Sequence, residues 1–168
     1  MRTTPEDKKQ QVIAGLVDAR SKILASVAAL PPAQQDVVFL GEWSVKDLLA
    51  HLIGWDFANL EATKEVLAGK LPSFYAHHDH DWRTYNARLV AEHKREDFAA
   101  LLEAVEDSHR QLEEYLRTVP AEEFGKDRGL RFRGWRVTIT ALLKAETSDE
   151  RKHHEQIEEF RRRAAADR

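Results

Sequence analysis

Hydrophobic residues recur every three or four positions along most of the chain, and this spacing predicts a helical protein. The expected long helices cover about residues 5–30, 45–69, 96–119 and 135 to the tail, and a short helix covers residues 82–93. No segment shows the sustained alternation of apolar and polar residues that is typical of a strand. Four long amphipathic helices in a chain of 168 residues predict an all-α four-helix bundle.

Capping and breaking residues mark the ends of these helices. Thr4 and Ser44 are expected to cap the first two long helices, and Pro31 and Pro120 stop the helices before them. A further turn of helix is expected in "AQQDVV" (residues 33–38), and "GKDRGLRFRG" (residues 125–134) is expected to be a loop. The connection between the second and third long helices is longer than a hairpin turn needs. We therefore expect it to cross the end of the bundle, so that these two helices run parallel.

Composition narrows the class of protein. The net charge of −3 gives no overall attraction to nucleic acid or to an anionic membrane, and no run approaches the ~20 apolar residues of a membrane span. The absence of cysteine means that a metal would be held by His, Asp or Glu, and that any thiol would come with a small molecule. The polar N-terminus is unlike a secretory signal, so a cytoplasmic protein is expected. No repeat or low-complexity linker divides the chain, and we expect a single domain over residues 1–168.

The apolar stripe of the last helix is interrupted in its middle. On a helical wheel, one broad arc holds Trp135, Ile139, Leu142, Leu143, Ile157 and Phe160, and the same arc holds Glu146, Asp149, Glu150 and His153. Burying such polar groups without partners would cost several kcal/mol each. The stripe therefore predicts that something compensates these side chains.

A divalent metal is the first candidate. Asp149 and His153 are four residues apart, so both project from one helix face, and His51 interrupts the apolar flank of the second long helix. Two imidazoles and one carboxylate suit Zn²⁺, Ni²⁺, Fe²⁺ or Mn²⁺. The alternatives are a metal-free hydrogen-bonded cluster, an ordinary ion pair between Asp149 and His153, and a packed core histidine at position 51.

Two other histidine positions are open to a simpler interpretation. His109 lies in the stripe of the third long helix and is expected to line the pocket or support a ligand rather than bind the metal. The "HHDH" run at residues 77–80 resembles a metal motif, but it has no helical scaffold and is interpreted as a surface loop.

The sequence resembles DinB-like four-helix bundle proteins, in particular the ClbS/DfsB branch. The similarity is carried by "GEWSVKDLLAHLIGWD" and "VTITALLKAETSDERKHHEQIEEF", with "YNARLV" and "RGW" as further matches. The resemblance implies an up-down-down-up bundle, often a homodimer, in which a histidine of the second helix and a His-x-x-x-His pair of the last helix hold a divalent metal. These positions map to His51, Asp149 and His153. The aspartate departs from the family pattern, which is also compatible with a member that has lost its metal.

Two functions remain open. The first is a metal-dependent hydrolase or a transferase using a low-molecular-weight thiol, acting on a small electrophilic molecule, with Glu146 or Glu150 as the general base. The second is a non-catalytic protein that sequesters a small molecule in the same pocket. In both cases we expect a small-molecule partner, and pocket walls formed by Trp43, Trp55, Trp82, Tyr85, Asn86, His109 and Trp135, although ordinary core packing is the simpler interpretation of each aromatic taken alone.

Overall fold

A computed structural model describes residues 3–77 and 81–167. Its elements in chain order are α1 (Pro5–Ala28), η1 (Pro32–Gln34), α2 (Val45–Leu67), η2 (Ser73–His77), α3 (Trp82–His93), α4 (Phe98–Thr118), α5 (Ala121–Phe124), β1 (Arg131–Phe132), β2 (Trp135–Arg136) and α6 (Ile139–Ala166). The predicted all-α fold is confirmed. Three residues of the "HHDH" run, at positions 78–80, lie outside the described residues.

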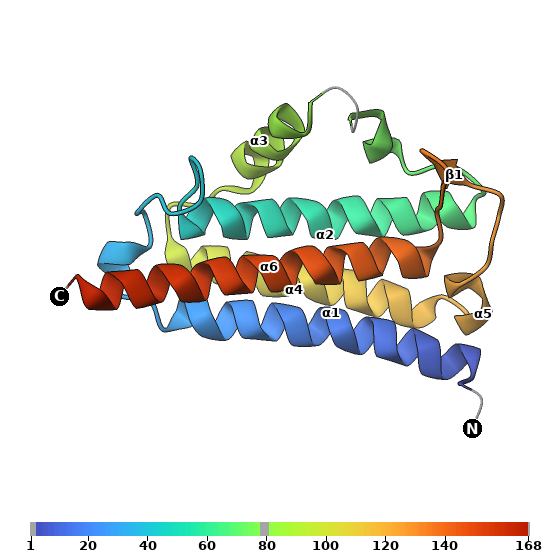
Figure 1. Ribbon diagram of the computed structural model, residues 1–168, viewed down its shortest axis with the longest axis horizontal. Coiled ribbons are helices and arrows are strands. Elements are labelled where there is room, and N and C mark those ends of the chain that lie inside the picture. The colour runs from blue at the N-terminus through green and yellow to red at the C-terminus, as the bar shows by residue number, and fades with distance from the viewer. Residues whose placement is uncertain (1–2, 78–80, 168) are drawn as a thin grey trace.

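The four long helices form a bundle with the predicted direction of each helix. In Figure 1, α1 and α6 run one way along the bundle, while α2 and α4 run the other way. The second and third long helices are therefore parallel, because the segment that contains η2 and α3 returns the chain to the end at which α2 begins. In this arrangement α1 packs mainly on α6, and α2 packs on both α4 and α3.

Local capping explains where the first two long helices begin. Thr4 and Asp7 form a capping box at the start of α1, and Ser44 and Asp47 form the same motif at the start of α2. Each pair satisfies two backbone N–H groups that a helix start leaves without partners. The start of α2 is therefore fixed by local chemistry, and this start sets which of its side chains face the bundle interior.

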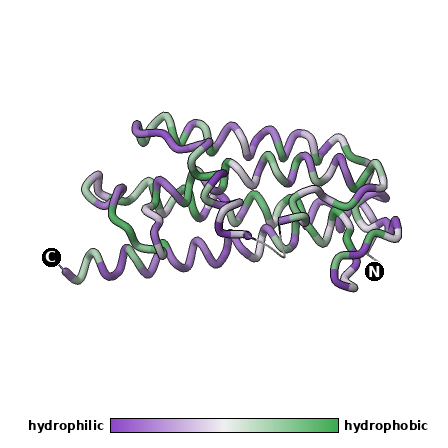
Figure 2. Tube along the Cα trace, turned by 90° about the horizontal axis from the view of Figure 1, so that it is seen from above, coloured by the Kyte–Doolittle hydropathy of each residue, from purple (hydrophilic) through white to green (hydrophobic). Residues whose placement is uncertain are grey.

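The hydrophobic core consists of two clusters at the two ends of the bundle. One includes Leu16, Phe124 and Leu143, and the other includes Ile23, Leu48 and Ile157. Hydrophobic and hydrophilic residues alternate along each long helix, as the colours in Figure 2 show. Among the described residues, no helix is long and apolar enough to cross a membrane.

The predicted start of the last helix is wrong by four residues. Trp135 and Arg136 pair with Arg131 and Phe132 in a short antiparallel hairpin, and α6 begins only at Ile139, after its cap Thr138. The turn of this hairpin has two consecutive residues with positive φ, Arg133 at 49° and Gly134 at 80°, as a type I′ turn requires. Part of the expected loop at residues 125–134 is thus a strand, and Trp135 belongs to that hairpin rather than to the stripe of α6.

Candidate active-site cavity

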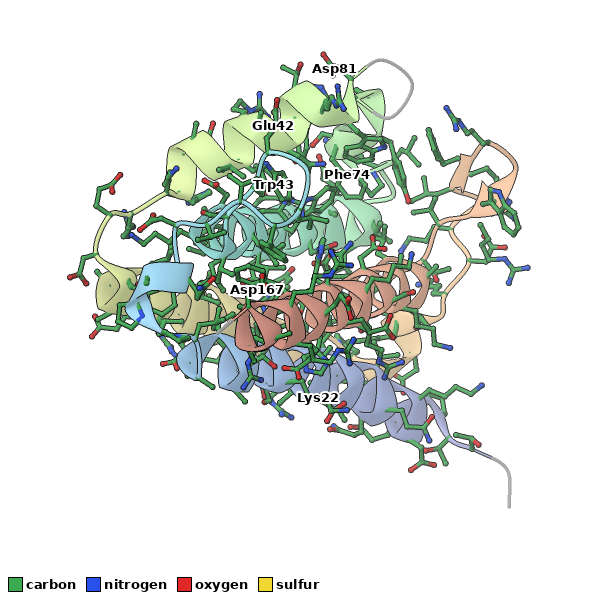
Figure 3. The ribbon with its side chains drawn as sticks, turned by 60° about the vertical axis from the view of Figure 1, so that its left-hand side comes forward. Lys22, Glu42, Trp43, Phe74, Asp81 and Asp167 are labelled. Carbon is green, nitrogen blue, oxygen red and sulfur yellow. The ribbon has the colours of Figure 1, made fainter. Side chains whose placement is uncertain are left out.

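A cavity of about 530 Å³ opens between α2, α3, η2 and α6, and it is called the aromatic cavity below. Its lining comprises Trp43, His51, Trp55, Asn59, Phe74, Tyr75, Trp82, Asn86, Leu142, Ala145, Glu146, Asp149, Lys152, His153 and Gln156. Trp43 and Phe74 lie on the side of the bundle that α3 covers, whereas Lys22 of α1 lies on the opposite side (Figure 3). The volume is within the range of small-molecule sites.

His51 and His153 meet in the wall of this cavity. Their ring centres are 5.5 Å apart, and the rings are nearly perpendicular at 86°. His51 is only 8% exposed, and its Nδ1 atom is buried without a hydrogen-bond partner in the structure. Burial, followed by the proximity of His153 and Arg20, lowers the pKa of His51 to about 3. The structure therefore holds a neutral, incompletely bonded imidazole at the position that the sequence singled out.

The second imidazole is oriented by an amide. His153 Nδ1 lies 2.8 Å from Oε1 of Gln156, one turn further along α6. Because an amide oxygen only accepts hydrogen bonds, Nδ1 is the donor in this contact, and Nε2 is the ring nitrogen that remains for a ligand. His153 can therefore act as a metal ligand or as a base through Nε2.

Glu146 is the carboxyl group of the cavity lining that has a raised pKa. Asn59 Nδ2 donates to its Oε2 at 3.0 Å, which fixes the carboxyl group beside the lining residues of α2. Burial and the nearby carboxylates of Glu150 and Asp56 raise the pKa of Glu146 to about 8. A carboxyl group with a pKa near the working pH is suited to both accepting and donating a proton.

Asp149 is part of the cavity lining, but most of its side chain is exposed to solvent. Its side chain is 63% exposed and pairs with Lys152 at 3.3 Å. On a wheel of 100° per residue, Asp149 lies about 60° from Glu146, at the edge of the predicted core-facing arc. Because its side chain is exposed, the prediction that Asp149 faces the core is wrong.

The predicted aromatic walls are partly assembled. Trp43, Trp55, Trp82 and Asn86 line the cavity. Tyr85 does not, but its ring is 5.6 Å from that of Trp55 and supports this wall from behind. Trp135 does not reach the cavity, since it lies on the hairpin with 79% of its surface exposed.

In the core of the bundle, Arg20 links three helices through a buried ion network. Its guanidinium donates to both carboxylate oxygens of Asp56 at 2.9 Å, and to both oxygens of Glu150 at 3.1 and 2.6 Å. Ser108 of α4 donates to the same Asp56 at 2.6 Å. Burial alone would lower the pKa of Arg20, but Asp56 and Glu150 hold it above its usual value. Glu150 is therefore engaged in the core, not in the cavity.

The same network contains a set of metal-type donors. Among residues 3–77 and 81–167, one group of three such side chains has donor atoms within 4.8 Å of one another, namely Asp56, His109 and Glu150. By distance this triad could hold an ion. Arg20, however, already neutralises both carboxylates, and an ion would have to displace a buried guanidinium. His109 is therefore a core residue, with Nδ1 at 3.7 Å from Asp56 and neither ring nitrogen hydrogen-bonded.

Sequence reasoning missed Arg20 and Asp56, although both left a signal. Arg20 stands between Leu16 and Ile23 in the apolar stripe of α1, and Asp56 follows Leu52 by four residues in that of α2. A charged residue in each of two facing stripes indicates an ion pair across the bundle.

The chain is similar to known proteins over most of its length. A family model described as "DinB superfamily" matches residues 16–157. No curated protein sequence matches significantly. An uncharacterised protein from Escherichia coli UTI89 has a similar crystal structure, with a TM-score of 0.70, 14% identity and 94% of each chain covered. The colibactin self-resistance protein ClbS, crystallised in complex with double-stranded DNA, has a TM-score of 0.72 at 17% identity, covering 91% of this chain and 94% of its own.

Proposed function

Because the chain belongs to the DinB superfamily, we propose that its aromatic cavity is the active site of a metal-dependent enzyme. The reaction is attack on a small electrophilic molecule, either hydrolysis or transfer of a low-molecular-weight thiol. The observation that carries this proposal is the meeting of His51 and His153 in the cavity wall, with the buried Nδ1 of His51 left without a partner.

Two of the three predicted donors, His51 and His153, are placed for a divalent ion. Two imidazoles that bind one ion at ~2.1 Å have ring centres about 5 to 6 Å apart, and those of His51 and His153 are 5.5 Å apart. Asp149 would be the third ligand, for which it would have to leave Lys152. The mixed N/O donors suit Zn²⁺, Ni²⁺, Fe²⁺ or Mn²⁺. Such an ion, when bound, lowers the pKa of a coordinated water or thiol.

The chain's own residues supply the remaining functions. Glu146, held by Asn59, accepts or donates a proton in the same cavity that the two histidines line. Trp55 donates through Nε1 to Asn86 at 3.0 Å, and this bond fixes one wall of the cavity against which a small molecule can pack. Glu150 is not assigned as a base here, since its carboxylate is bonded to Arg20.

The likeness to ClbS supports the kind of function without identifying the substrate. ClbS is named for self-resistance to colibactin, and at 17% identity the similarity extends to the fold. A protective reaction on a reactive small molecule fits the same cavity. ClbS was crystallised with double-stranded DNA, but this chain has a net charge of −3, and we propose a small-molecule partner rather than nucleic acid.

A non-catalytic sequestering protein is the second candidate. The pairing of Asp149 with Lys152 favours it, since this pairing leaves two donor side chains facing the cavity instead of three. Such a protein would bind one molecule per cavity and release it unchanged.

Turnover of chromogenic electrophiles separates the two candidates. The tag-free protein, loaded with each metal in turn, is assayed with p-nitrophenyl acetate for hydrolysis and with 1-chloro-2,4-dinitrobenzene plus glutathione for thiol transfer. An enzyme gives many product molecules per chain with at least one pair of metal and probe, and this activity falls at least about tenfold in Glu146→Gln and His153→Ala.

His154→Ala is the matched control for His153→Ala. His154 is the neighbouring residue of α6, does not line the cavity, and lies 4.0 Å from Glu158. This variant should keep the activity of the wild type. Binding of one probe molecule per chain, with no product above the uncatalysed rate, would instead support sequestration.

A further inference from the structure

The surface between α1 and α6 is hollowed into a groove of about 990 Å³, which is called the α1–α6 groove below. In Figure 1 the two helices lie side by side, and α5 packs against them near the end at which both begin. Among the described residues, this groove and the aromatic cavity have no lining residue in common, because they use opposite sides of α6. The groove is therefore a separate candidate site.

The charge of the α1–α6 groove is positive. Four basic side chains line it, namely Lys8 of α1, Arg136 of β2, and Lys144 and Arg151 of α6. Glu122 supplies the one carboxyl group among the described lining residues. Four basic groups against one acidic group give the lining a formal charge of +3, in a chain whose net charge is −3. The groove therefore differs in sign from the molecule as a whole.

Three of the four basic groups are not neutralised by a direct partner. Among the described residues, Lys8, Lys144 and Arg151 form neither an ion pair nor a side-chain hydrogen bond. Arg151 acts on the carboxylate of Asp18 only from a distance, since that carboxylate is paired with Lys22 at 2.8 Å. The positive charge of the groove is thus free to act on a ligand.

A solvated helix face is the simpler interpretation of exposed basic residues, but such a face usually mixes both signs of charge. Elsewhere on the long helices, basic side chains pair with acids one turn away, as Lys22 does with Asp18 and Arg117 with Glu113.

The sequence around the groove lacks such acids. The positions three and four residues before and after Lys8 hold Thr, Pro, Gln and Val, and those around Lys144 hold Thr, Ala and Ser. No carboxylate on the same helix can therefore reach either ammonium group as an i,i+3 or i,i+4 partner. Like charges that face one groove repel each other, and a bound anion would relieve this repulsion.

The neutral polar groups of the groove suit an anion as well. Gln11, Thr140 and Ser148 supply one amide and two hydroxyl groups that can donate hydrogen bonds. The N-terminus of α6 adds partial positive charge at the same place, since the described first turn of this helix has no acidic side chain. The starts of α1 and α2, by contrast, carry Asp7 and Asp47.

We propose that the α1–α6 groove binds a small molecule with a phosphate chain, such as a di- or triphosphate, between Lys8 of α1 and Lys144 of α6, with Arg151 further along. Three cations without direct partners match several negative charges rather than one, and ammonium and guanidinium groups both form charge-assisted hydrogen bonds to phosphate. The volume is large enough for a molecule of this size. This site goes beyond the proposed function, because it lies outside the aromatic cavity.

Tripolyphosphate is the probe that carries the anion alone. Titration calorimetry on the tag-free wild-type protein, freed of metal on a chelating resin and measured in about 0.15 M salt, should show one saturable site with a dissociation constant below about 1 mM. Adenosine triphosphate should compete with tripolyphosphate, and neutral adenosine should not.

Two results would overturn the proposal. The first is the absence of saturable tripolyphosphate binding at this salt concentration. The second is a short DNA duplex that binds the wild type more tightly than tripolyphosphate does, since the phosphate groups recognised would then be those of nucleic acid. Neither measurement needs metal or turnover, so the outcome does not depend on the proposed function.

Substitutions with matched controls locate the binding. Lys144→Gln and Arg151→Gln should each raise the dissociation constant of tripolyphosphate about fivefold or more, because each removes one charge from the groove. Lys70→Gln and Arg95→Gln remove the same charge at exposed positions outside the groove, and should change the constant less than about twofold.

All four positions are exposed, so the variants should fold like the wild type, which circular dichroism checks. Equal losses in the groove variants and in their controls would mean that tripolyphosphate is attracted by overall charge, and this result would contradict the assignment to the α1–α6 groove.

Discussion

Arg20 is the residue on which the polar layer between the two core clusters depends. It binds Asp56 of α2 and Glu150 of α6 at once, and each of the three side chains is 1% exposed. Replacing a cation in such a network leaves two carboxylates buried without compensation, a far larger effect than loss of a surface ion pair.

Arg20→Met is expected to lower the free energy of unfolding by about 3–5 kcal/mol. Urea denaturation measures the change. Lys22→Met removes the exposed pair with Asp18 on the same helix and should leave stability nearly unchanged. A loss under ~1 kcal/mol in Arg20→Met would mean that the network contributes little.

Glu146 makes stability depend on pH. Its pKa rises from 4.5 to about 8 in the folded protein, so the folded state keeps a proton that the unfolded chain releases. Stability should therefore fall as the pH rises from about 4.5 to about 8, and level off above this window. Glu146→Gln cannot ionise, and its stability relative to the wild type should increase by roughly 1–3 kcal/mol between pH 5 and pH 8.

Urea denaturation of both proteins at several pH values measures this difference, and Glu155→Gln, an exposed position on the same helix, serves as the control. A constant difference between Glu146→Gln and the wild type across the window would show that Glu146 titrates normally.

Among the elements, α3 decides whether the cavity is covered. It packs on α2 where Gly54 leaves space for Leu89, and a β-carbon at residue 54 would lie 2.7 Å from Cβ of Leu89. Since that contact involves an atom next to the backbone, α3 would have to move as a whole. The wall formed by Trp82 and Asn86 moves with it.

Gly54→Ala should therefore destabilise the protein and weaken binding in the cavity, although alanine normally favours a helix interior by roughly 0.5–1 kcal/mol. Gly15→Ala provides the comparison, because its β-carbon would have an ordinary contact of 3.5 Å with Thr147. We expect Gly15→Ala to raise the melting temperature and Gly54→Ala to lower it. A shift of the same sign in both variants would contradict this account of the packing.

The elements that sequence predicts well are those with local signals. The residues of α3 agree with the expected helix at both ends, and Ser44 caps α2 as expected. The predicted start of α6 is wrong because Trp135 fits a helical stripe in the sequence. In the structure, a turn with positive φ at Arg133 and Gly134 places Trp135 in a β-hairpin. Periodicity cannot detect such a turn.

The candidate site was likewise predictable only where helical spacing determines the position of a side chain. Helical spacing placed His51 and His153 on facing helices, and the structure brings both to one cavity. Whether the third predicted ligand, Asp149, reaches the ion depends on its rotamer and on its pairing with Lys152. A helical wheel describes neither. The position of Arg20 between Asp56 and Glu150 depends on packing between helices that are distant in sequence.

For the whole molecule, the resemblance to its family predicts a homodimer. Multi-angle light scattering should give twice the mass of the chain at micromolar concentration. Trp135 and Val38 are among the large apolar side chains left exposed. A monomer mass across micromolar concentrations would refute the prediction.

The central claim is that His51 and His153 hold one divalent ion in the aromatic cavity, and elemental analysis of protein purified without a metal-affinity tag tests it most directly. We predict about one equivalent of a divalent transition metal per chain in the wild type and in His154→Ala, and almost none in His51→Ala or His153→Ala. Wild-type protein that takes up no ion even when metal is supplied, or histidine variants that keep the full equivalent, would contradict the claim.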